Sequence, residues 1–353
     1  MKKIVSLFLV IVMVLSLTAC GGAKKEETSA PAEAGSSAPA EAPVKARELK
    51  FSTAVPVTSA WHKGAEHFAN TVTEKTNGKF TFTIHPSDEL SGGNQGTGIE
   101  LLQTGATDIH LQDAMVWSSV ATKCIVACFP WLLPTYEDVD KYMAGEGGEM
   151  LKQTITDAGC VCLAVGENGY RQVVNTRNPI ETPEDMAALK MRVPGSNVHV
   201  NLLKYIGADP LTMSQSEVYT SLQQGTIDAC ENTLDLLFTQ NTLEVVDYLT
   251  LWNYSYDPIF LSVSNKLWNE LTDEEKVIFQ EAADEAMKIE VEAARAVVAD
   301  LLTQFDKYPE VEVIEELSAE QLAAFQEAVA PIYEDYREEI GEDFFAAFGY
   351  TFE

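Results

Sequence analysis

Residues 170–194 read YRQVVNTRNPIETPEDMAALKMRVP, and this stretch predicts a strand, a short helix and a second strand. Gln172–Asn175 is rich in residues that favour strands. Thr182 is a good N-cap, Pro183 suits the first helical position, and Asp185 places an acid in the first turn.

Each of the two predicted strands carries one arginine, Arg171 in the first and Arg192 in the second. The chain has 54 acidic and 24 basic residues, so paired arginines are conspicuous. A guanidinium offers a planar fork of donors that matches a carboxylate. Two interpretations stay open at this point: a receptor site for a carboxylate, or arginines paired with acids of their own protein.

The chain begins with a targeting segment, predicted to be a signal peptide over residues 1–19. Lys2 and Lys3 precede an apolar run that is too short for an ordinary membrane span. The segment ends Leu-Thr-Ala-Cys20, which looks like a bacterial lipobox. We expect export and acylation of Cys20. Cleavage without lipidation is the alternative.

Residues 20–46 consist mainly of Ala, Glu, Pro, Ser, Gly and Lys. Such a composition cannot bury enough apolar surface to offset the entropy of ordering, so we predict a disordered tether. The residues that follow are sufficient for two domains. The net charge of −30 argues against nucleic acid and anionic lipid surfaces as partners.

The segments that follow the tether alternate between strand and helix patterns, which predicts an α/β sheet with crossover connections. Residues 102–108, LQTGATD, are echoed by residues 222–228, LQQGTID. Asp113 and Asn232 follow the two copies. We interpret the echo as two similar α/β lobes, each directing one polar residue at a shared cleft. Independent use of a common helix-to-strand turn is the alternative.

Two long helical patterns lie in the last part of the chain. Thr272 and Glu275 form a capping box before a pattern that extends to about Asp306. A helix of roughly 30 residues would be about 45 Å long and would lie across both lobes. Ser318 caps a closing helix that continues through Tyr336.

The cysteines and histidines show no metal-site spacing. The five cysteines after Cys20 are interpreted as small buried hydrophobic residues, and they are Cys124, Cys128, Cys160, Cys162 and Cys230. No catalytic motif of a common hydrolase, nucleotide-binding protein or metalloprotease is present. We therefore predict ligand capture without a cofactor or a metal.

The central unit resembles the solute-binding proteins of TRAP transporters, the C4-dicarboxylate-binding DctP family. The resemblance rests on Gly169–Arg171, Pro179–Asp185 and Leu189–Pro194, and it continues through Ser216–Tyr219 to Glu231-Asn232. It spans nearly the whole folded part. It implies an α/β, two-lobed periplasmic-binding-protein-like fold, with a long helix bridging both lobes and a ligand cleft between them.

The resemblance also implies the site. Arg192 matches the family's main partner of the substrate carboxylate, Arg171 its second arginine, and Asn232 the asparagine that completes the carboxylate site. Asp113 falls where the first lobe of some members contributes an acid. Four further residues fall near cleft positions: Trp61, Trp117, Gln215 and Tyr254.

Three departures argue against a substrate like sialic acid. Some sugar-acid binders have an aromatic residue at the position of Gln215 and an asparagine at that of Gly195, and Asn253-Tyr254 replaces a common Asn-His pair.

The expected organisation is lobe I over residues 47–169 and about 258–297, with lobe II over 170–257 and about 298–353. The expected partners are a small organic acid, the TRAP membrane subunits, and a membrane reached through the lipid anchor. Two alternatives are an exported enzyme that uses Asp113 or Glu231 as a general base, and a sensory lipoprotein with the same fold.

Overall fold

The computed structural model describes residues 45–353, so the predicted signal peptide, Cys20 and most of the tether lie outside the described residues. Residues 170–194 form strand, short helix and strand, as expected. The helix is a single 3₁₀ turn, η3 (Pro183–Met186), with a capping box between Thr182 and Asp185. It leads into β5 (Lys190–Val193), which carries Arg192.

The strands form two sheet regions that share one strand, β4 (Cys160–Asn175). The first region has the order β2 (Phe80–His85), β1 (Arg47–Thr53), β3 (Ile109–Asp113), β9 (Tyr256–Ser264), β4. In the second, β4 pairs with β7 (Ala229–Thr233) and β8 (Tyr248–Thr250); β7 leads to β5 and β6 (Asp209–Thr212), and β8 leads to β10 (Glu312–Ile314). We call the first region with its helices lobe I and the second lobe II.

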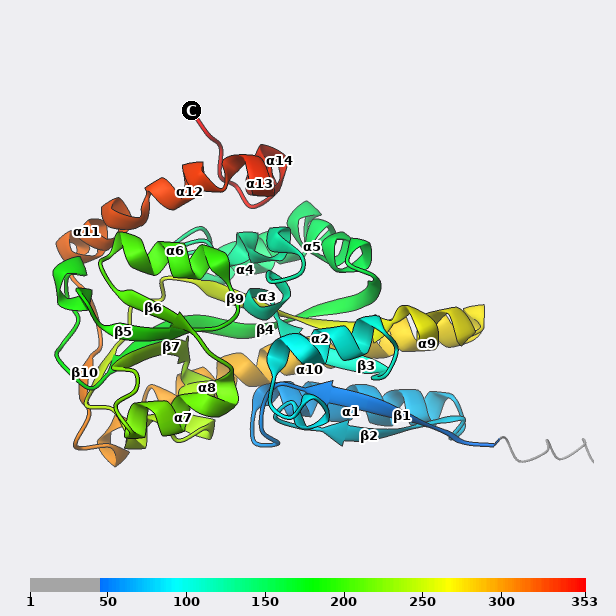
Figure 1. Cartoon of the computed structure of the whole chain (residues 1–353). Helices are drawn as coiled ribbons and strands as arrows, with labels where there is room; N and C mark the ends of the chain where they lie inside the picture. The colour runs from blue at the N-terminus through cyan, green and yellow to red at the C-terminus, as the bar shows by residue number, and fades with distance from the viewer. Residues whose placement is uncertain (1–44) are drawn as a thin grey trace, which may run out of the picture. The chain divides into compact units, whose positions relative to one another are not determined.

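β4 passes from one lobe to the other without interruption (Figure 1). Its residues up to Tyr170 pair with β9, and its residues from Arg171 pair with β7. Two register shifts, at Cys162/Ala164 and Glu167/Gly169, lie in the β9 ladder just before the crossing. The hinge between the lobes is therefore built partly from paired strands.

The helices flank these sheets (Figure 1). They are α1 (Ala60–Lys75), α2 (Gln95–Gln103), α3 (Ala114–Trp117), α4 (Tyr136–Met143), α5 (Glu146–Asp157), α6 (Asn197–Tyr205), α7 (Gln215–Gln223), α8 (Leu234–Thr239), α9 (Asn265–Glu270), α10 (Asp273–Leu301), α11 (Ala319–Val329), α12 (Pro331–Asp335), α13 (Arg337–Ile340) and α14 (Glu342–Ala347). Short 3₁₀ turns are η1 (Glu89–Ser91), η2 (Thr122–Cys128), η4 (Thr242–Glu244) and η5 (Phe305–Lys307).

The long helix α10 packs against α1 of lobe I, along β4, and against α8 of lobe II. It has 29 residues and begins at the predicted capping box of Thr272 and Glu275. It ends at Leu301, earlier than the expected end near Asp306, because the chain turns at Leu302 and enters η5. The prediction of a helix bridging both lobes is confirmed.

The prediction of one closing helix through Tyr336 is wrong in one respect: this stretch forms two helices, α11 and α12, with Pro331 at the start of α12. The short helices α13 and α14 follow it, with Gly341 at a positive φ before α14. α11 packs against α6, and α14 packs against α5 and η2. The C-terminal helices therefore cover parts of the chain that the sequence assigned to both lobes.

The repeated turn is structurally the same in the two lobes. Asp108 accepts a hydrogen bond from the backbone N–H of Lys50 at 2.9 Å, and Asp228 accepts one from Lys190 at 3.0 Å. Gly105 and Gly225 have φ of 69° and 67°, a backbone conformation that glycine adopts without strain. β3 pairs in parallel with β1, and β7 with β5. The interpretation as paired lobes is supported in detail.

Candidate functional site

A narrow cavity lies between the lobes. Its atom-free volume of about 290 Å³ includes open solvent, and the space open to the centre of a water-sized sphere is about 10 Å³. Side chains of both lobes line it, and Arg192 is among them. The full lining is Ala54, Val55, Trp61, Gln95, Asp113, Asn168, Arg171, Arg192, Pro194, Gln215, Asn232, Leu236 and Gln240.

Arg192 projects from β5 with only 1% of its surface exposed. Its Nε donates to the carbonyl of Met213 at 2.8 Å, and its Nη2 lies 3.5 Å from Oε1 of Gln95. Among residues 45–353 it forms no salt bridge with a carboxylate. Burial lowers the pKa of Arg192 to about 10, with repulsion from Arg171 adding to the effect, so the guanidinium stays cationic at neutral pH. A buried cation without an anion is a strong reason to look for an anionic ligand.

Arg171, which the resemblance assigns as the second arginine of the site, has carboxylate partners within the protein. Its guanidinium pairs with Glu231 through Nε and Nη2, and its Nη1 donates to Asp257 at 2.7 Å. It still lines the cavity, but two internal acids already balance its charge. Of the two original interpretations, internal pairing holds for Arg171 and an unpaired cation holds for Arg192.

Two polar residues from the echoed turns meet at the cavity. Asp113 is the N-cap of α3, where its Oδ1 accepts from the N–H of Val116 at 3.0 Å. Burial raises the pKa of Asp113, while Arg171 opposes the shift. Asn232 accepts from the N–H of Thr233 and donates to Oε1 of Gln215 at 3.1 Å. Hence lobe I presents an acid and lobe II presents amides beside Arg192.

The other expected cleft residues divide into two groups. Trp61 and Gln215 line the cavity. Trp117 is fully buried in the hydrophobic core and does not line it. Tyr254 is also buried, and its hydroxyl donates to Glu231 at 3.1 Å, which places it behind Arg171. Trp117 and Tyr254 therefore pack behind the site and do not face the cavity.

Sequence reasoning missed Gln95, Asn168, Leu236 and Gln240. Gln95 could have been found, because Asn94 caps α2 through the N–H of Thr97 and places Gln95 at the start of the helix. Asn168 belongs to no recognisable sequence motif. It lies at the register shift of β4, and its side-chain amide donates to Asp257 at 2.8 Å.

A buried group of acids lies behind Arg171. Burial, together with Asp113, raises the pKa of Asp257 to about 7. Glu231 is fully buried and bonded to both Arg171 and Tyr254. These acids hold the Arg171 guanidinium in place at the wall of the cavity.

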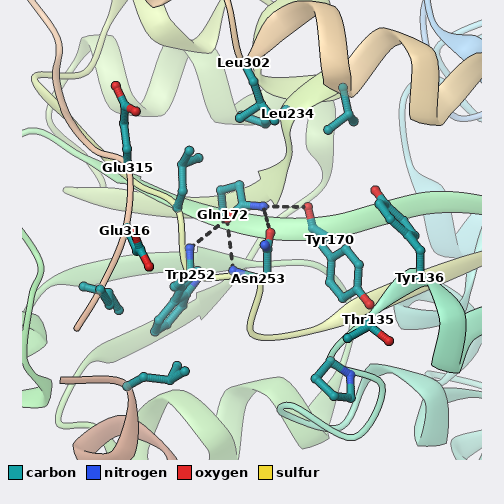
Figure 2. Close-up of a pocket in the computed structure, with 15 residues that line it drawn as sticks. Thr135, Tyr136, Tyr170, Gln172, Leu234, Trp252, Asn253, Leu302, Glu315 and Glu316 are labelled. Atoms are coloured by element: carbon teal, nitrogen blue, oxygen red, sulfur yellow. Dashed lines mark hydrogen bonds between the residues drawn. The ribbon is translucent and has the colours of Figure 1, made fainter. Parts of the chain in front are cut away.

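A larger pocket lies elsewhere, with an atom-free volume of about 1360 Å³ that includes open solvent (Figure 2). It contains Tyr170 and Gln172, which alternate with Arg171 along β4 and so project to the opposite side. Gln172 is fixed by hydrogen bonds with Trp252 and Asn253. Its lining holds no Lys, Arg or His and includes Glu315 and Glu316, so it does not suit a carboxylate.

Within residues 45–353 no group of three His, Cys, Asp or Glu is arranged to hold a metal ion. The five cysteines in this range are buried and free, as predicted: Cys124, Cys128, Cys160, Cys162 and Cys230. No helix in the same range combines the length and apolar character needed to cross a membrane.

The two lobes, the long bridging helix and the enclosed cavity are the features of a solute-binding protein. The model of bacterial extracellular solute-binding protein family 7, DctP, matches residues 51–339. The chain belongs to this family, and the resemblance seen in the sequence is confirmed.

Known relatives agree with this assignment. The C4-dicarboxylate-binding periplasmic protein DctP of Rhodobacter capsulatus is 29% identical over 308 residues, covering 85% of this chain and 89% of that protein. A TRAP periplasmic solute-binding protein of Sulfurospirillum deleyianum, solved with bound succinate, is 29% identical with a TM-score of 0.81, covering 85% and 97%. A third, from Polaromonas sp. JS666 with bound D-erythronate, is 30% identical with a TM-score of 0.81, covering 85% and 97%.

Proposed function

We propose that this protein captures a small organic acid between its lobes and delivers it to the membrane subunits of a TRAP transporter. The observation that carries the proposal is the buried Arg192 guanidinium, which lies in an interlobe cavity without a carboxylate partner among the described residues. A ligand carboxylate would supply the missing countercharge. The relatives solved with succinate and D-erythronate support this chemistry.

Several donors surround the place where such a carboxylate would bind. Nη2 of Arg192 faces Gln95, and the amides of Asn232 and Gln215 line the same cavity. Charge-assisted hydrogen bonds contribute about 1.5–3 kcal/mol each. Two or three of them account for most of a micromolar affinity, about −8 kcal/mol. The charge of Arg171 is compensated by Glu231 and Asp257, so this residue forms part of the cavity wall and serves as a second hydrogen-bond donor to the ligand.

The space in this cavity that is open to the centre of a water-sized sphere is about 10 Å³, enough for about one water molecule, so the lobes must move apart to admit an organic acid. The choice of acid is therefore argued from residues. The departures at Gln215 and Gly195 argue against a substrate like sialic acid.

We propose capture without chemical conversion. Glu231, one of two candidate general bases, is committed to Arg171 and Tyr254, and it has no oxygen free for a substrate proton. Asp113 faces the cavity but caps α3 through Val116. Incubation of the protein with a bound acid, followed by mass spectrometry of the recovered ligand, should return the acid unchanged.

We further propose that the mature chain is exported and held at the outer face of the membrane by acylated Cys20, with residues up to 46 as a spacer. The periplasmic names of its relatives fit export. Metabolic labelling with a palmitate analogue should tag the wild type and not Cys20→Ala.

The function is tested by Arg192→Gln. Acids that stabilise the wild type are first found by thermal shift with succinate, D-erythronate and D-galacturonate. Calorimetry with the best of them should then show affinity reduced at least about a hundredfold in the variant, because one or two charge-assisted bonds are lost.

The matched control is Arg177→Gln, which removes a guanidinium that is 64% exposed and lies in a weak contact with Asp228. It should bind as the wild type does. Unchanged binding by Arg192→Gln would refute the site, and equal losses in both variants would point to a general loss of positive charge.

A further inference from the structure

Of the hydrogen bonds within residues 45–353, the one from the guanidinium of Arg192 to Gln95 is the one that links it to lobe I. Gln95 is the first residue of α2, with 8% of its surface exposed. Its Oε1 lies 3.5 Å from Nη2 of Arg192 and accepts from the backbone N–H of Gln215 at 3.3 Å. One side chain of lobe I therefore contacts both β5 and α7 of lobe II.

The loop before Gln95 reinforces this contact. Ser216 donates to the carbonyl of Gly93 at 3.2 Å. Gly93 has φ of 86°, and a Cβ at this position would lie 2.8 Å from Oγ of Ser216. The backbone of lobe I thus approaches the start of α7 as closely as a glycine permits.

A second set of contacts between the lobes involves Ser59, the N-cap of α1. Its hydroxyl donates to Asp235 of α8 at 2.6 Å, and the N–H of Ala60 donates to the same carboxylate oxygen at 3.3 Å. Neither bond involves Arg192. Ser59 and Asp235 do not line the cavity, whereas Gln95 and Arg192 do.

A carboxamide can serve both states of the site because it has an acceptor oxygen and a donor NH₂. In this structure the oxygen faces the guanidinium. A half-turn of the carboxamide about its last side-chain bond would instead present the NH₂ to a carboxylate on Arg192. A ligand shifts an equilibrium between open and closed forms only through a difference in affinity for the two, and a bond available only after closure provides that difference.

We propose that Gln95 is the residue through which lobe I detects a carboxylate bound on Arg192, so that it makes closure depend on the ligand and selects for an acid. This inference rests on the proposed function. Gln95 lies on the opposite lobe from Arg192, so its substitution should affect closure as well as affinity, while substitution of Arg192 should weaken binding at least about a hundredfold.

The first test is Gln95→Glu, which places a tethered carboxylate beside Arg192. We expect this variant to have, without any added acid, the smaller radius of gyration in small-angle X-ray scattering that the wild type adopts on binding. We also expect it to bind added acid at least about tenfold more weakly, because the tethered group competes for the same donors.

Two controls accompany this variant. Adding Arg192→Gln to Gln95→Glu should abolish the compaction in the absence of ligand, as expected for two groups that interact directly. Gln326→Glu adds the same charge to an exposed position of α11 and should leave both radius and affinity unchanged. A Gln95→Glu protein that stays extended and binds acid normally would overturn the inference.

The second test is Gln95→Leu, which keeps the approximate volume and removes both hydrogen-bonding groups. Affinity for the acid chosen by thermal shift should fall about tenfold or more, and ligand-induced compaction should diminish. Tighter binding would show that Gln95 only competes with the ligand, and unchanged binding and compaction would show that it has no part in capture. Either result overturns the inference while leaving an Arg192→Gln loss, and with it the proposed function, intact.

Discussion

Arg171 and Arg192 lie on the two strands of one small unit, and the structure gives them different tasks. Glu231 and Asp257 surround the first, while a backbone carbonyl and a glutamine are the neighbours of the second. The sequence could not separate them, because the acids that pair with Arg171 lie 60 and 86 residues further along the chain. Only the pairing of β4 with β7 and β9 brings those acids to it.

This difference predicts opposite effects on stability. Arg171→Met leaves two buried carboxylates without their cation, and loss of one partner of a buried pair costs about 3–5 kcal/mol. Urea denaturation of the ligand-free protein should show a loss of this size. Arg192→Met removes no ion pair and should cost clearly less. Equal losses would mean that Arg192 also has a structural countercharge.

The candidate site was predicted in part. Asp113, Asn232 and Gln215 surround the cavity with the two arginines, and the echoed turns were the physical signal for the first two. The family resemblance placed Trp117 and Tyr254 near the cleft, but the direction of an aromatic side chain depends on tertiary packing. Both are in the core.

At the scale of elements, local signals were the most reliable. The capping boxes at Thr182, Thr272 and Ser318 all start helices where the sequence places them. The joining of strands was harder to predict. The apolar run from Cys160 and the strand around Gln172 form the single strand β4, because the intervening glycines are accommodated by register shifts. The residue-by-residue pattern cannot distinguish such a continuous strand from two shorter ones.

The contact between β4 and α10 gives a prediction about one glycine. A Cβ at Gly166 would lie 2.6 Å from Oε2 of Glu290 and 2.9 Å from both Ile259 and Met287. Gly166→Ala should therefore destabilise the fold by about 1–3 kcal/mol, the usual cost of overpacking. Thermal or urea unfolding measures it.

Gly195→Ala is the matched control, since a Cβ there has no neighbour within 4 Å. It should change the free energy of unfolding by less than about 0.5 kcal/mol. A Gly166→Ala protein as stable as this control would show that α10 can move away from β4 at little cost.

At the scale of the whole molecule, two buried groups near the site make the free energy of unfolding depend on pH, with opposite signs. His199 is fully buried, and burial, with a smaller effect from repulsion by Arg171, lowers its pKa to about 3. The pKa of a histidine in the unfolded chain is about 6.5, so the contribution of His199 to stability is complete above that pH and is lost as pH falls toward 3. Asp257, with its pKa raised to about 7, has the opposite sign: its contribution is complete below about 4 and is lost as pH rises through 7.

His199→Gln removes one of these sources. Relative to the wild type, the variant should gain about 2 kcal/mol in free energy of unfolding as pH falls from 7 to 5. In this range His199 of the wild type binds a proton only in the unfolded state, and this binding favours unfolding of the wild type alone. Urea titrations at several pH values measure the difference. Parallel curves for the two proteins would show that His199 is not held neutral by the fold.

The general architecture was accessible from the sequence because each lobe repeats a local pattern, and the bridging helix has a long uninterrupted apolar stripe. The contacts between the lobes were not accessible. Ser59 with Asp235 and Gln95 with Arg192 join residues that no periodicity relates, and both depend on how far the lobes approach each other.

The strand β4, shared by both sheet regions, has a mechanical consequence. Sideways sliding or rotation of one half against the other would break main-chain hydrogen bonds along it, so the low-energy motion is a bend about a single axis near the Glu167/Gly169 register shift. The strand therefore acts as a hinge with a single bending axis. In the proposed closing motion, such a hinge would bring Gln95 and Arg192 back to the same relative position each time.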